Sequence, residues 1–307
     1  MPLHIDYRPQ TLEDFAGNPS MVDSLKAVLS REKDIPHSFM FTGASGCGKT
    51  TLGRIVAKSI GCSDNDFKEL DSAAFRGIDT IREIRNQARL KPMSGKTRVW
   101  LLDEVHKMTN DAQNALLKIL EDTPSHVYFI LCTTDPQKVL KTIQSRCMQF
   151  QVNPLSERQM TSLLKSVVEK EGITDFPEEA YANIHQNSLG HVRAALVMLD
   201  KVIDLEPKRI LRIIEQSKGE EGQVIDLCRA LLKRESWKKI ASLLRAIQEE
   251  QEAESVRYAV LGYMNSVLLK EDNPVAAICI EQFKHNFYDS GKPGLTEACY
   301  SVVKVDL

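Results

Sequence analysis

The chain has 307 residues, of which 27% are charged and 42% hydrophobic, and its formal net charge at pH 7 is -2. This length exceeds one average domain, and the composition is ordinary for a soluble globular protein. No apolar run approaches the roughly 18 residues that span a bilayer, and the N-terminus has no signal-peptide pattern. We therefore expect a cytoplasmic protein with no membrane partner, in which any contact with DNA depends on a local basic face.

The seven cysteines lie far apart, and none belongs to a C-x-x-C pair. This spacing argues against a disulfide framework and against a zinc site. The odd number of cysteines suits a reducing compartment.

The first half of the chain predicts strands that alternate with helices. Short apolar runs at 39–41, 99–102 and 127–131 are typical of buried strands, and helical periodicity covers 51–60, 78–90 and 112–121. This alternation is typical of βαβ units, in which helices cover a parallel sheet. The predicted fold class is therefore α/β.

From residue 156 onward nearly every segment has helical periodicity, with short interruptions at Gly172, Pro207 and Asn273–Pro274. We place one boundary near 152 and a second, less distinct one near 206. The expected architecture is an α/β core over 1–151, a helical lid over 152–205 and an all-helical domain over 206–307.

Residues 43–50 match the P-loop pattern G-x-x-x-x-G-K-[ST] and lie between a predicted strand and a predicted helix. The glycines allow backbone N–H groups to converge on phosphate oxygens at the positive end of the helix. We expect Lys49 to neutralise the β- and γ-phosphates of ATP and the Thr50 hydroxyl to bind Mg²⁺. The predicted nucleotide-binding residues here are Gly43, Ala44, Ser45, Gly46, Cys47, Gly48, Lys49, Thr50 and Thr51.

Two acidic residues, Asp103 and Glu104, close the second predicted strand. In P-loop enzymes the first acid holds Mg²⁺, and a second acid can polarise the attacking water. An exposed acidic turn is the alternative interpretation. Together with the P-loop, the pair predicts ATP hydrolysis, with Asp103 and Thr50 on the metal and Glu104 and Lys49 in catalysis.

Several further motifs resemble those of known ATPases. One set of motifs resembles the bacterial clamp-loader gamma/tau subunit, a P-loop ATPase of the AAA+ type: Asp103–His106, Asn114–Lys118, Thr133–Lys138 and Ser145–Cys147. A second set resembles replication factor C small subunits: Tyr7–Pro9, Asp14–Gly17 and Arg76–Asp79. The resemblance is dense over 5–150 and thinner to about 204. It implies the ATPase subunit of a sliding-clamp loader, in which ATP binding assembles and opens the clamp and DNA-triggered hydrolysis releases it on primer–template DNA.

The resemblance also implies roles for single residues. Thr134 matches sensor 1, a hydroxyl at a strand end that orients water. Arg146 matches the arginine finger, which reaches the ATP of the neighbouring subunit. Arg193 matches sensor 2, a lid arginine that contacts phosphate in its own chain, although His191 and Val192 depart from the gamma/tau pattern. The positions that flank the adenine are Arg8, Pro9, Phe15 and Ala16, for which an N-terminal packing strand is the alternative.

The helix predicted at 78–90 carries a basic stripe. Arg82, Arg85 and Arg89 follow i, i+3, i+7 spacing, opposite an apolar face. Such a stripe beside a helix N-terminus suits the phosphate backbone rather than base edges. The resemblance implies that these helices follow primer–template DNA, and the predicted contacts are Arg76, Gly77, Ile78, Arg82 and Arg85. The alternative is a solvated face that pairs with Glu83.

Two departures from the gamma/tau pattern bear on cofactors and partners. That subunit carries a zinc-binding cysteine cluster after the position of Cys62, whereas here Cys62 leads into Ser63–Asp66, so no zinc is predicted. The long tail of tau is also not expected after the helical domain. A compact phage loader in the host cytoplasm, or an otherwise reduced one, fits both features. The expected partners are a sliding clamp, primer–template DNA and further clamp-loader subunits in a homo- or hetero-pentameric ring. The resemblance implies that the helical domain at 206–307 is the collar that joins these subunits.

Three alternatives stay open from the sequence. Another AAA+ DNA-remodelling motor, for branch migration or helicase loading, would predict a C-terminal winged helix, but no strand pair is evident after residue 206. A clamp-loader subunit that does not hydrolyse ATP would typically have a damaged P-loop. A small-molecule P-loop kinase would not need Ser145–Cys147.

Overall fold

The computed structural model describes residues 2–31, 34–72, 77–216, 220–250, 252–287 and 290–305. The chain forms two compact units: Met1–His185 with Gly190–Pro207, and Gln186–Leu189 with Lys208–Leu307. The first unit therefore contains the predicted core and the predicted lid except for residues 186–189. The finer division into core, lid and C-terminal domain stays a prediction.

The first unit is built on a five-stranded sheet in the order β2-β3-β4-β1-β5, and all described strand pairs are parallel. This confirms the predicted α/β class. The strands are β1 (Ser38–Thr42), β2 (Cys62–Asp71), β3 (Thr97–Asp103), β4 (Val127–Thr133) and β5 (Met148–Gln151). The apolar runs had predicted β1, β3 and β4, whereas β2 and β5 had no such signal.

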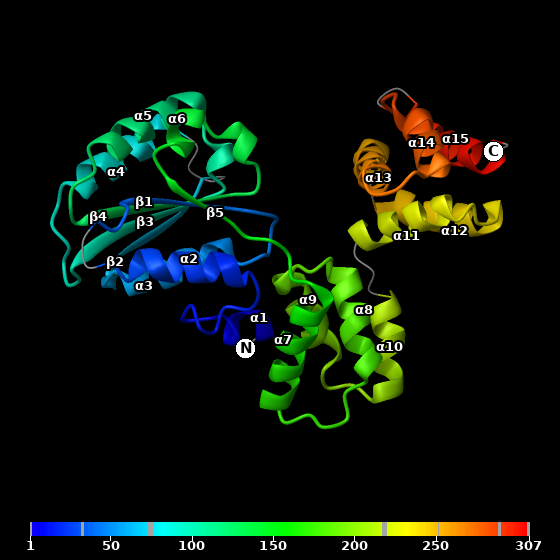
Figure 1. Ribbon diagram of the computed structural model, residues 1–307, viewed down its shortest axis with the longest axis horizontal. Coiled ribbons are helices and arrows are strands. Elements are labelled where there is room, and N and C mark those ends of the chain that lie inside the picture. Colours follow the sequence, from blue (N-terminus) through cyan, green and yellow to red (C-terminus); the bar gives the residue numbers. More distant parts are fainter. Residues whose placement is uncertain are drawn as a thin grey trace. The chain divides into compact units, whose positions relative to one another are not determined.

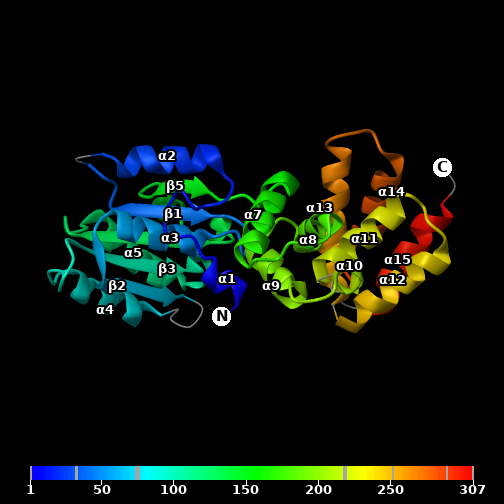
Figure 2. The same ribbon diagram turned by 90° about the horizontal axis from the view of Figure 1, so that it is seen from below.

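Helices cover both faces of this sheet (Figures 1 and 2). Side chains alternate between the faces of a strand, so Phe39 and Phe41 join one apolar core while Met40 joins the other. The helices on the first face are α2 (Pro19–Leu29) and α3 (Lys49–Ser59); those on the second are α4 (Ile78–Ala88), α5 (Asn110–Glu121) and α6 (Lys141–Gln144). Because helices cover both faces of the central strands, the side chains of these strands are apolar along the whole run. Such continuous apolar runs allowed the strands to be predicted from the sequence.

A helical segment follows β5. It contains α7 (Glu157–Lys170), α8 (Glu178–Ser188) and α9 (Val192–Val202), and the last residues of α8 belong to the second unit. The N-terminal helix α1 (Leu3–Asp6) packs on α9, where the Leu3 N–H donates to Asp200 Oδ1 at 3.4 Å. The Tyr7 hydroxyl donates to Glu171 Oε1 at 2.5 Å, and this bond together with burial raises the pKa of Tyr7 to about 12. The first residues of the chain are thus tied to the helical segment.

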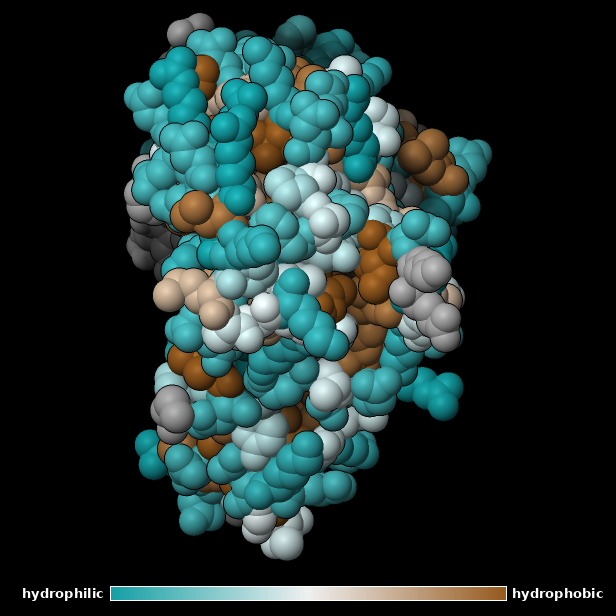
Figure 3. Space-filling model, turned by 90° about the vertical axis from the view of Figure 1, so that its left-hand side faces the viewer, coloured by the Kyte–Doolittle hydropathy of each residue, from teal (hydrophilic) through white to brown (hydrophobic). Residues whose placement is uncertain are grey.

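The second unit is all helical in its described residues. Its helices are α10 (Pro207–Gln216), α11 (Glu220–Leu232), α12 (Trp237–Glu250), α13 (Ala253–Leu268), α14 (Pro274–Phe283) and α15 (Gly291–Lys304). Helices α11 to α15 share one apolar core. Across the described parts of both units, no helix is long and apolar enough to cross a membrane. The face shown in Figure 3 is mainly hydrophilic, with hydrophobic residues in separate patches.

A buried carboxylate organises the turn between α4 and β3. The side chain of Asp66, on β2, has no exposed surface, and it accepts backbone N–H groups from Met93 (2.6 Å), Ser94 (3.0 Å) and Gly95 (2.9 Å). Burial alone would raise the pKa of this carboxyl. The hydrogen bonds from the turn and from the Ser63 hydroxyl outweigh it and hold the pKa well below its usual range.

We predict that Asp66→Asn lowers the free energy of unfolding by about 1–3 kcal/mol at pH 7, because the amide keeps one acceptor oxygen and places an NH₂ donor against other buried donors of the turn. The folded-state pKa lies below the unfolded value of about 4. The stabilisation is therefore present above pH about 4 and is lost as the pH falls through the folded-state pKa. Thermal melts from pH 8 to pH 2 measure this, with the exposed Asp64→Asn on the same strand as control. Equal melting curves for the two variants at neutral pH would contradict the prediction.

Candidate active site

The loop from Gly43 to Thr50 joins β1 to α3 and requires glycine at two of its positions. Gly43 has φ +148°, and a Cβ there would lie 2.1 Å from the carbonyl oxygen of Val152. Gly48 has φ +102°, and its Cβ would lie 2.9 Å from the Phe15 ring. Backbone and neighbours therefore approach the loop too closely for any side chain at these positions.

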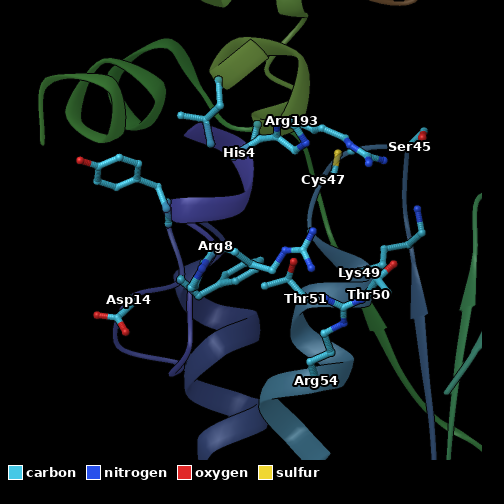
Figure 4. Close-up of a pocket in the computed structure, with 18 of the residues that line it drawn as sticks. His4, Arg8, Asp14, Ser45, Cys47, Lys49, Thr50, Thr51, Arg54 and Arg193 are labelled. Atoms are coloured by element: carbon cyan, nitrogen blue, oxygen red, sulfur yellow. The ribbon is translucent and has the colours of Figure 1, made fainter. Parts of the chain in front are cut away.

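Two side chains at the start of α3 make defined contacts at the site. Lys49 is only 5% exposed, and its Nζ donates to the carbonyl oxygens of Gly43 and Ala44, both at 2.9 Å. The Thr50 hydroxyl donates to Asp103 Oδ2 at 2.7 Å, which joins the P-loop helix to the end of β3. Figure 4 shows Lys49, Thr50 and Thr51 on the same helix end.

Glu104 lies at the turn after β3 in a left-handed backbone conformation, with φ +53°. Its N–H donates to Asp103 Oδ1 at 2.9 Å, so both oxygens of that carboxylate are held. The Glu104 carboxylate itself lies 3.3 Å from Nε2 of His106 and 3.5 Å from Nζ of Lys107, both in the short helix η1 (Val105–Lys107). Sequence reasoning had named both acids but neither of these two partners.

A cavity of about 390 Å³ opens in front of these groups, within the first unit. It brings together most of the predicted nucleotide residues: Arg8, Pro9, Phe15, Ala16, Ser45, Gly46, Cys47, Gly48, Lys49, Thr50, Thr51, Asp103, Glu104 and Arg193. Residues outside that prediction also line it: His4, Tyr7, Asp14, Arg54, Glu69, Leu163, Val192 and Leu196. Gly43 and Ala44 lie beneath the cavity and supply the carbonyls that hold Lys49.

Comparisons of the sequence with known proteins all match subunits of DNA polymerase III. Residues 63–156 match a family described as "DNA polymerase III, delta subunit". DNA polymerase III subunit gamma of Buchnera aphidicola (subsp. Schizaphis graminum) is 30% identical over 292 residues, covering 87% of this chain and 80% of that protein. Subunit tau of Escherichia coli is 29% identical, covering 88% of this chain and 45% of tau. Subunit gamma/tau of Mycobacterium tuberculosis (strain H37Rv) is 33% identical, covering 66% of this chain and 39% of that protein.

The chain belongs to the gamma/tau family of DNA polymerase III subunits. It is therefore an AAA+ ATPase subunit of the clamp-loader type, as the sequence resemblance implied. It spans less than half the length of the matched tau and gamma/tau proteins of Escherichia coli and Mycobacterium tuberculosis.

Solved structures confirm the fold. The Holliday junction branch migration motor RuvB of Thermotoga maritima superposes with a TM-score of 0.58 and 17% identity, covering 77% of this chain and 84% of that one. At this identity the likeness concerns the AAA+ fold alone. The alternative of a branch-migration or helicase-loading motor is not favoured, because the matched relatives are gamma/tau subunits.

In this gamma/tau chain Arg193, the predicted sensor 2, contacts the P-loop. The backbone N–H of Arg193, in the first turn of α9, donates to the carbonyl oxygen of Gly46 at 3.3 Å, and its side chain lines the cavity (Figure 4). Arg8 lines the same cavity from the N-terminal segment. Burial, followed by repulsion from Arg54, lowers the pKa of Arg8. Both arginines are thus positioned to compensate an anionic ligand.

An ion pair on the cavity wall was missed by sequence reasoning. Arg54 donates through Nε and Nη2 to the two carboxylate oxygens of Glu69, at 2.8 and 2.9 Å. Arg54 follows Thr50 by one helical turn, and residues i and i+4 share a helix face. This spacing could have predicted that Arg54 lies on the same side of α3 as Thr50. Glu69 lies on β2, the strand that the apolar pattern had not revealed.

Thr133, the last residue of β4, and Thr134, which follows it, differ in their surroundings. Thr133 is fully buried, and its Oγ1 lies 3.0 Å from Nδ1 of His106 and accepts the N–H of Asp135 at 3.0 Å. Thr134, the predicted sensor, does not belong to the described residues that line the cavity. Its assignment stays a prediction.

The predicted arginine finger lies away from the cavity of its own chain. Arg146 Nη2 donates to Glu121 Oε1 at 2.6 Å, and Nη1 donates to the Thr142 carbonyl oxygen at 3.0 Å. The next residue, Cys147, is buried, and burial raises the pKa of its thiol to about 12. Cys147 therefore anchors the backbone in the core while Arg146 stays at the surface.

The predicted DNA-binding helix has the expected two faces. Arg82, Arg85 and Arg89 are exposed, whereas the opposite face, Ile81, Ile84 and Ala88, is buried. Arg82 pairs with Asp79 at 2.9 Å rather than with Glu83. Gly77 is the N-cap and Ile78 the first residue of α4, and Arg76 lies outside the described residues.

We predict that Lys49→Ala abolishes ATP binding, because the cation that would meet the phosphates is removed. Glu104→Gln should bind ATP but not hydrolyse it, because the amide cannot accept a proton from water. Equilibrium binding of a fluorescent ATP analogue and phosphate release measure the two steps. An Asp64→Asn variant, exposed on β2 and outside the described lining of the cavity, serves as control for general effects on folding. Hydrolysis at the wild-type rate by Glu104→Gln would contradict the assignment.

Proposed function

We propose that this chain binds Mg·ATP in the cavity of the first unit and hydrolyses it in a clamp-loader ring. The observation that carries the proposal is the 2.7 Å hydrogen bond between Thr50 and Asp103, with Glu104 next to it and Lys49 at the start of α3. Glu104 accepts a proton from a water whose oxygen attacks the γ-phosphorus. The bond between that phosphorus and the β–γ bridging oxygen breaks, and ADP and phosphate leave.

The residues present fit Mg²⁺. A threonine hydroxyl and a carboxylate that share a hydrogen bond are hard oxygen ligands, which this ion prefers, and phosphate oxygens complete such sites. Thr50 and Asp103 would hold the ion, and bound Mg²⁺ would neutralise charge on the transferring phosphoryl group.

Arg146 supports an active site completed by a neighbouring subunit. Its guanidinium lies at the surface, 36% exposed, and the described lining of its own cavity does not include it. Its ion pair with Glu121 is half exposed, and such pairs contribute only about 0–1 kcal/mol. The guanidinium can therefore exchange Glu121 for a phosphate of the next subunit at little cost.

We predict that Arg146→Ala leaves Mg·ATP binding intact and lowers hydrolysis by about 10³-fold, the usual contribution of a finger that acts in trans. Mixing gives a sharper readout. Lys49→Ala rings and Arg146→Ala rings should each be inactive, whereas mixed rings regain activity where an Arg146→Ala subunit receives the finger of a Lys49→Ala neighbour.

The control for mixing is subunit exchange, followed with two fluorescent labels. Mixed rings that exchange subunits but stay inactive would refute the trans mechanism. So would an isolated monomer that hydrolyses ATP at the rate of the full assembly.

We further propose that α4 follows the backbone of primer–template DNA and that the ring, of five subunits, opens a sliding clamp when ATP binds. The exposed arginines on one face of α4 support the DNA contact. ATP binding shifts the population toward the open, clamp-bound assembly, because the nucleotide has higher affinity for that state. DNA entry then triggers hydrolysis, which releases the clamp.

We predict that neutralising Arg82 and Arg85 to Gln reduces the slope of log K against log salt by about 0.7–0.9 for each phosphate that the protein no longer neutralises. DNA-stimulated ATPase should fall, while basal ATPase stays the same. The control is Arg158→Gln, an exposed cation on α7. Unchanged DNA affinity in the Arg82/Arg85 double variant would favour the solvated-face interpretation.

A further inference from the structure

Three side chains form a chain of contacts beside the cavity: an ion-pair contact between Glu104 and His106, and a hydrogen bond between His106 and Thr133. His106 lies between the Glu104 carboxylate, 3.3 Å from its Nε2, and the Thr133 hydroxyl, 3.0 Å from its Nδ1. The His106 side chain is only 10% exposed, and Thr133 is fully buried at the end of β4. The chain therefore connects the turn after β3 with the end of the neighbouring strand.

The contacts of Thr133 fit the tautomer of neutral His106 in which Nδ1 accepts a hydrogen bond. Thr133 Oγ1 already accepts the Asp135 N–H at 3.0 Å, so its own proton is available to donate. The acceptor within reach is Nδ1 of His106. A neutral imidazole that accepts at Nδ1 carries its proton on Nε2, the nitrogen that lies 3.3 Å from the Glu104 carboxylate.

The Glu104 carboxylate depends on side-chain partners for its orientation, because the backbone at Glu104 is not held by a long regular element. It lies in a left-handed conformation that non-glycine residues rarely adopt, at the start of a three-residue helix. Lys107 reaches the same carboxylate oxygen at 3.5 Å, but its Nζ is on a long side chain that is 41% exposed. His106 is the rigid, nearly buried partner of the carboxylate.

We propose that His106 is a positioning residue for ATP hydrolysis: it orients the Glu104 carboxylate through Nε2 and is itself fixed through Nδ1 by Thr133. This arrangement rests on the proposed role of Glu104 as the acceptor of the water proton. A base oriented by a third group recurs in enzymes with an activated nucleophile. Removing such a supporting partner typically costs about 10- to 100-fold in activity.

The test compares two substitutions that keep different halves of the imidazole. The amide of His106→Gln reaches the Nε2 position and can still donate to Glu104. The amide of His106→Asn reaches only the Nδ1 position and can still contact Thr133. We expect His106→Asn to lower kcat by about 10- to 100-fold with unchanged ATP affinity, and His106→Gln to stay within several-fold of wild type.

The readouts separate positioning from a structural role. Steady-state kcat, the Kd for Mg·ATP and the melting temperature are measured for both variants without DNA. The matched control is His126→Asn, a histidine that contacts the Leu90 carbonyl oxygen away from the cavity. If both His106 variants lost kcat, ATP affinity and thermal stability together, the role would be structural and the proposal would fail.

Glu104→Gln distinguishes failure of this proposal from failure of the proposed function. If Glu104→Gln is inactive and His106→Asn retains wild-type kcat, the positioning role is wrong and the catalytic role of Glu104 stands. If Glu104→Gln hydrolyses ATP normally, the catalytic role of Glu104 and the positioning role of His106 are both wrong.

Discussion

The site depends on the fact that the carboxyl ends of parallel strands meet at one edge of a sheet. β1 and β3 both lie beside β4, so the loop after β1 and the acids after β3 come together although they are far apart in sequence. The hydrogen bond from Thr50 to Asp103 joins them. Its two ends are held separately, Thr50 by the first turn of α3 and Asp103 by the backbone N–H of Glu104. A nucleotide that binds there would meet the P-loop and the Thr50–Asp103 pair in fixed positions.

Sequence motifs predicted this part of the site because each has a local physical cause. The P-loop requires glycines in its own backbone, and the apolar runs of β1, β3 and β4 follow from coverage on both faces. β2 was not predicted, because its exposed and buried residues alternate irregularly, with charged side chains along most of its length. For the same reason Glu69, and with it the ion pair to Arg54, was missed. The role of His106 was also not predicted, because its partner Thr133 is 27 residues away.

Asp66 shows how one buried carboxylate can organise a segment in this family. The sequence departs from the gamma/tau pattern after Cys62, where a zinc-binding cysteine cluster was the family expectation. In this chain Asp66 follows four residues later, and its carboxylate collects the N–H groups of the turn at 93–95. Arg98 lies 3.5 Å from it and donates to the carbonyl oxygens of Gln87 and Lys91. The end of α4 is thereby fixed to β3 by hydrogen bonds. Nothing in local propensity indicates such a hub, since an aspartate is usually exposed.

Three cationic side chains that are proposed to act in ATP hydrolysis or lie on the cavity wall share one feature. Each already pairs with an oxygen atom of the protein. Lys49 donates to P-loop carbonyls, Arg54 to Glu69, and Arg146 to Glu121. Phosphate oxygens must therefore compete with these protein acceptors. The free-energy cost of replacing each contact depends on how well that contact is shielded from water. The Arg146 pair is half exposed and weak, so the proposed finger could change partners readily, whereas Lys49 is nearly buried and would give up two hydrogen bonds of 2.9 Å. Phosphate binding at the P-loop is consequently the step with the larger rearrangement, and engagement of the finger the easily reversible one. Under the proposed trans mechanism, the weak contact of Arg146 would let a neighbouring subunit complete the site without a large structural change.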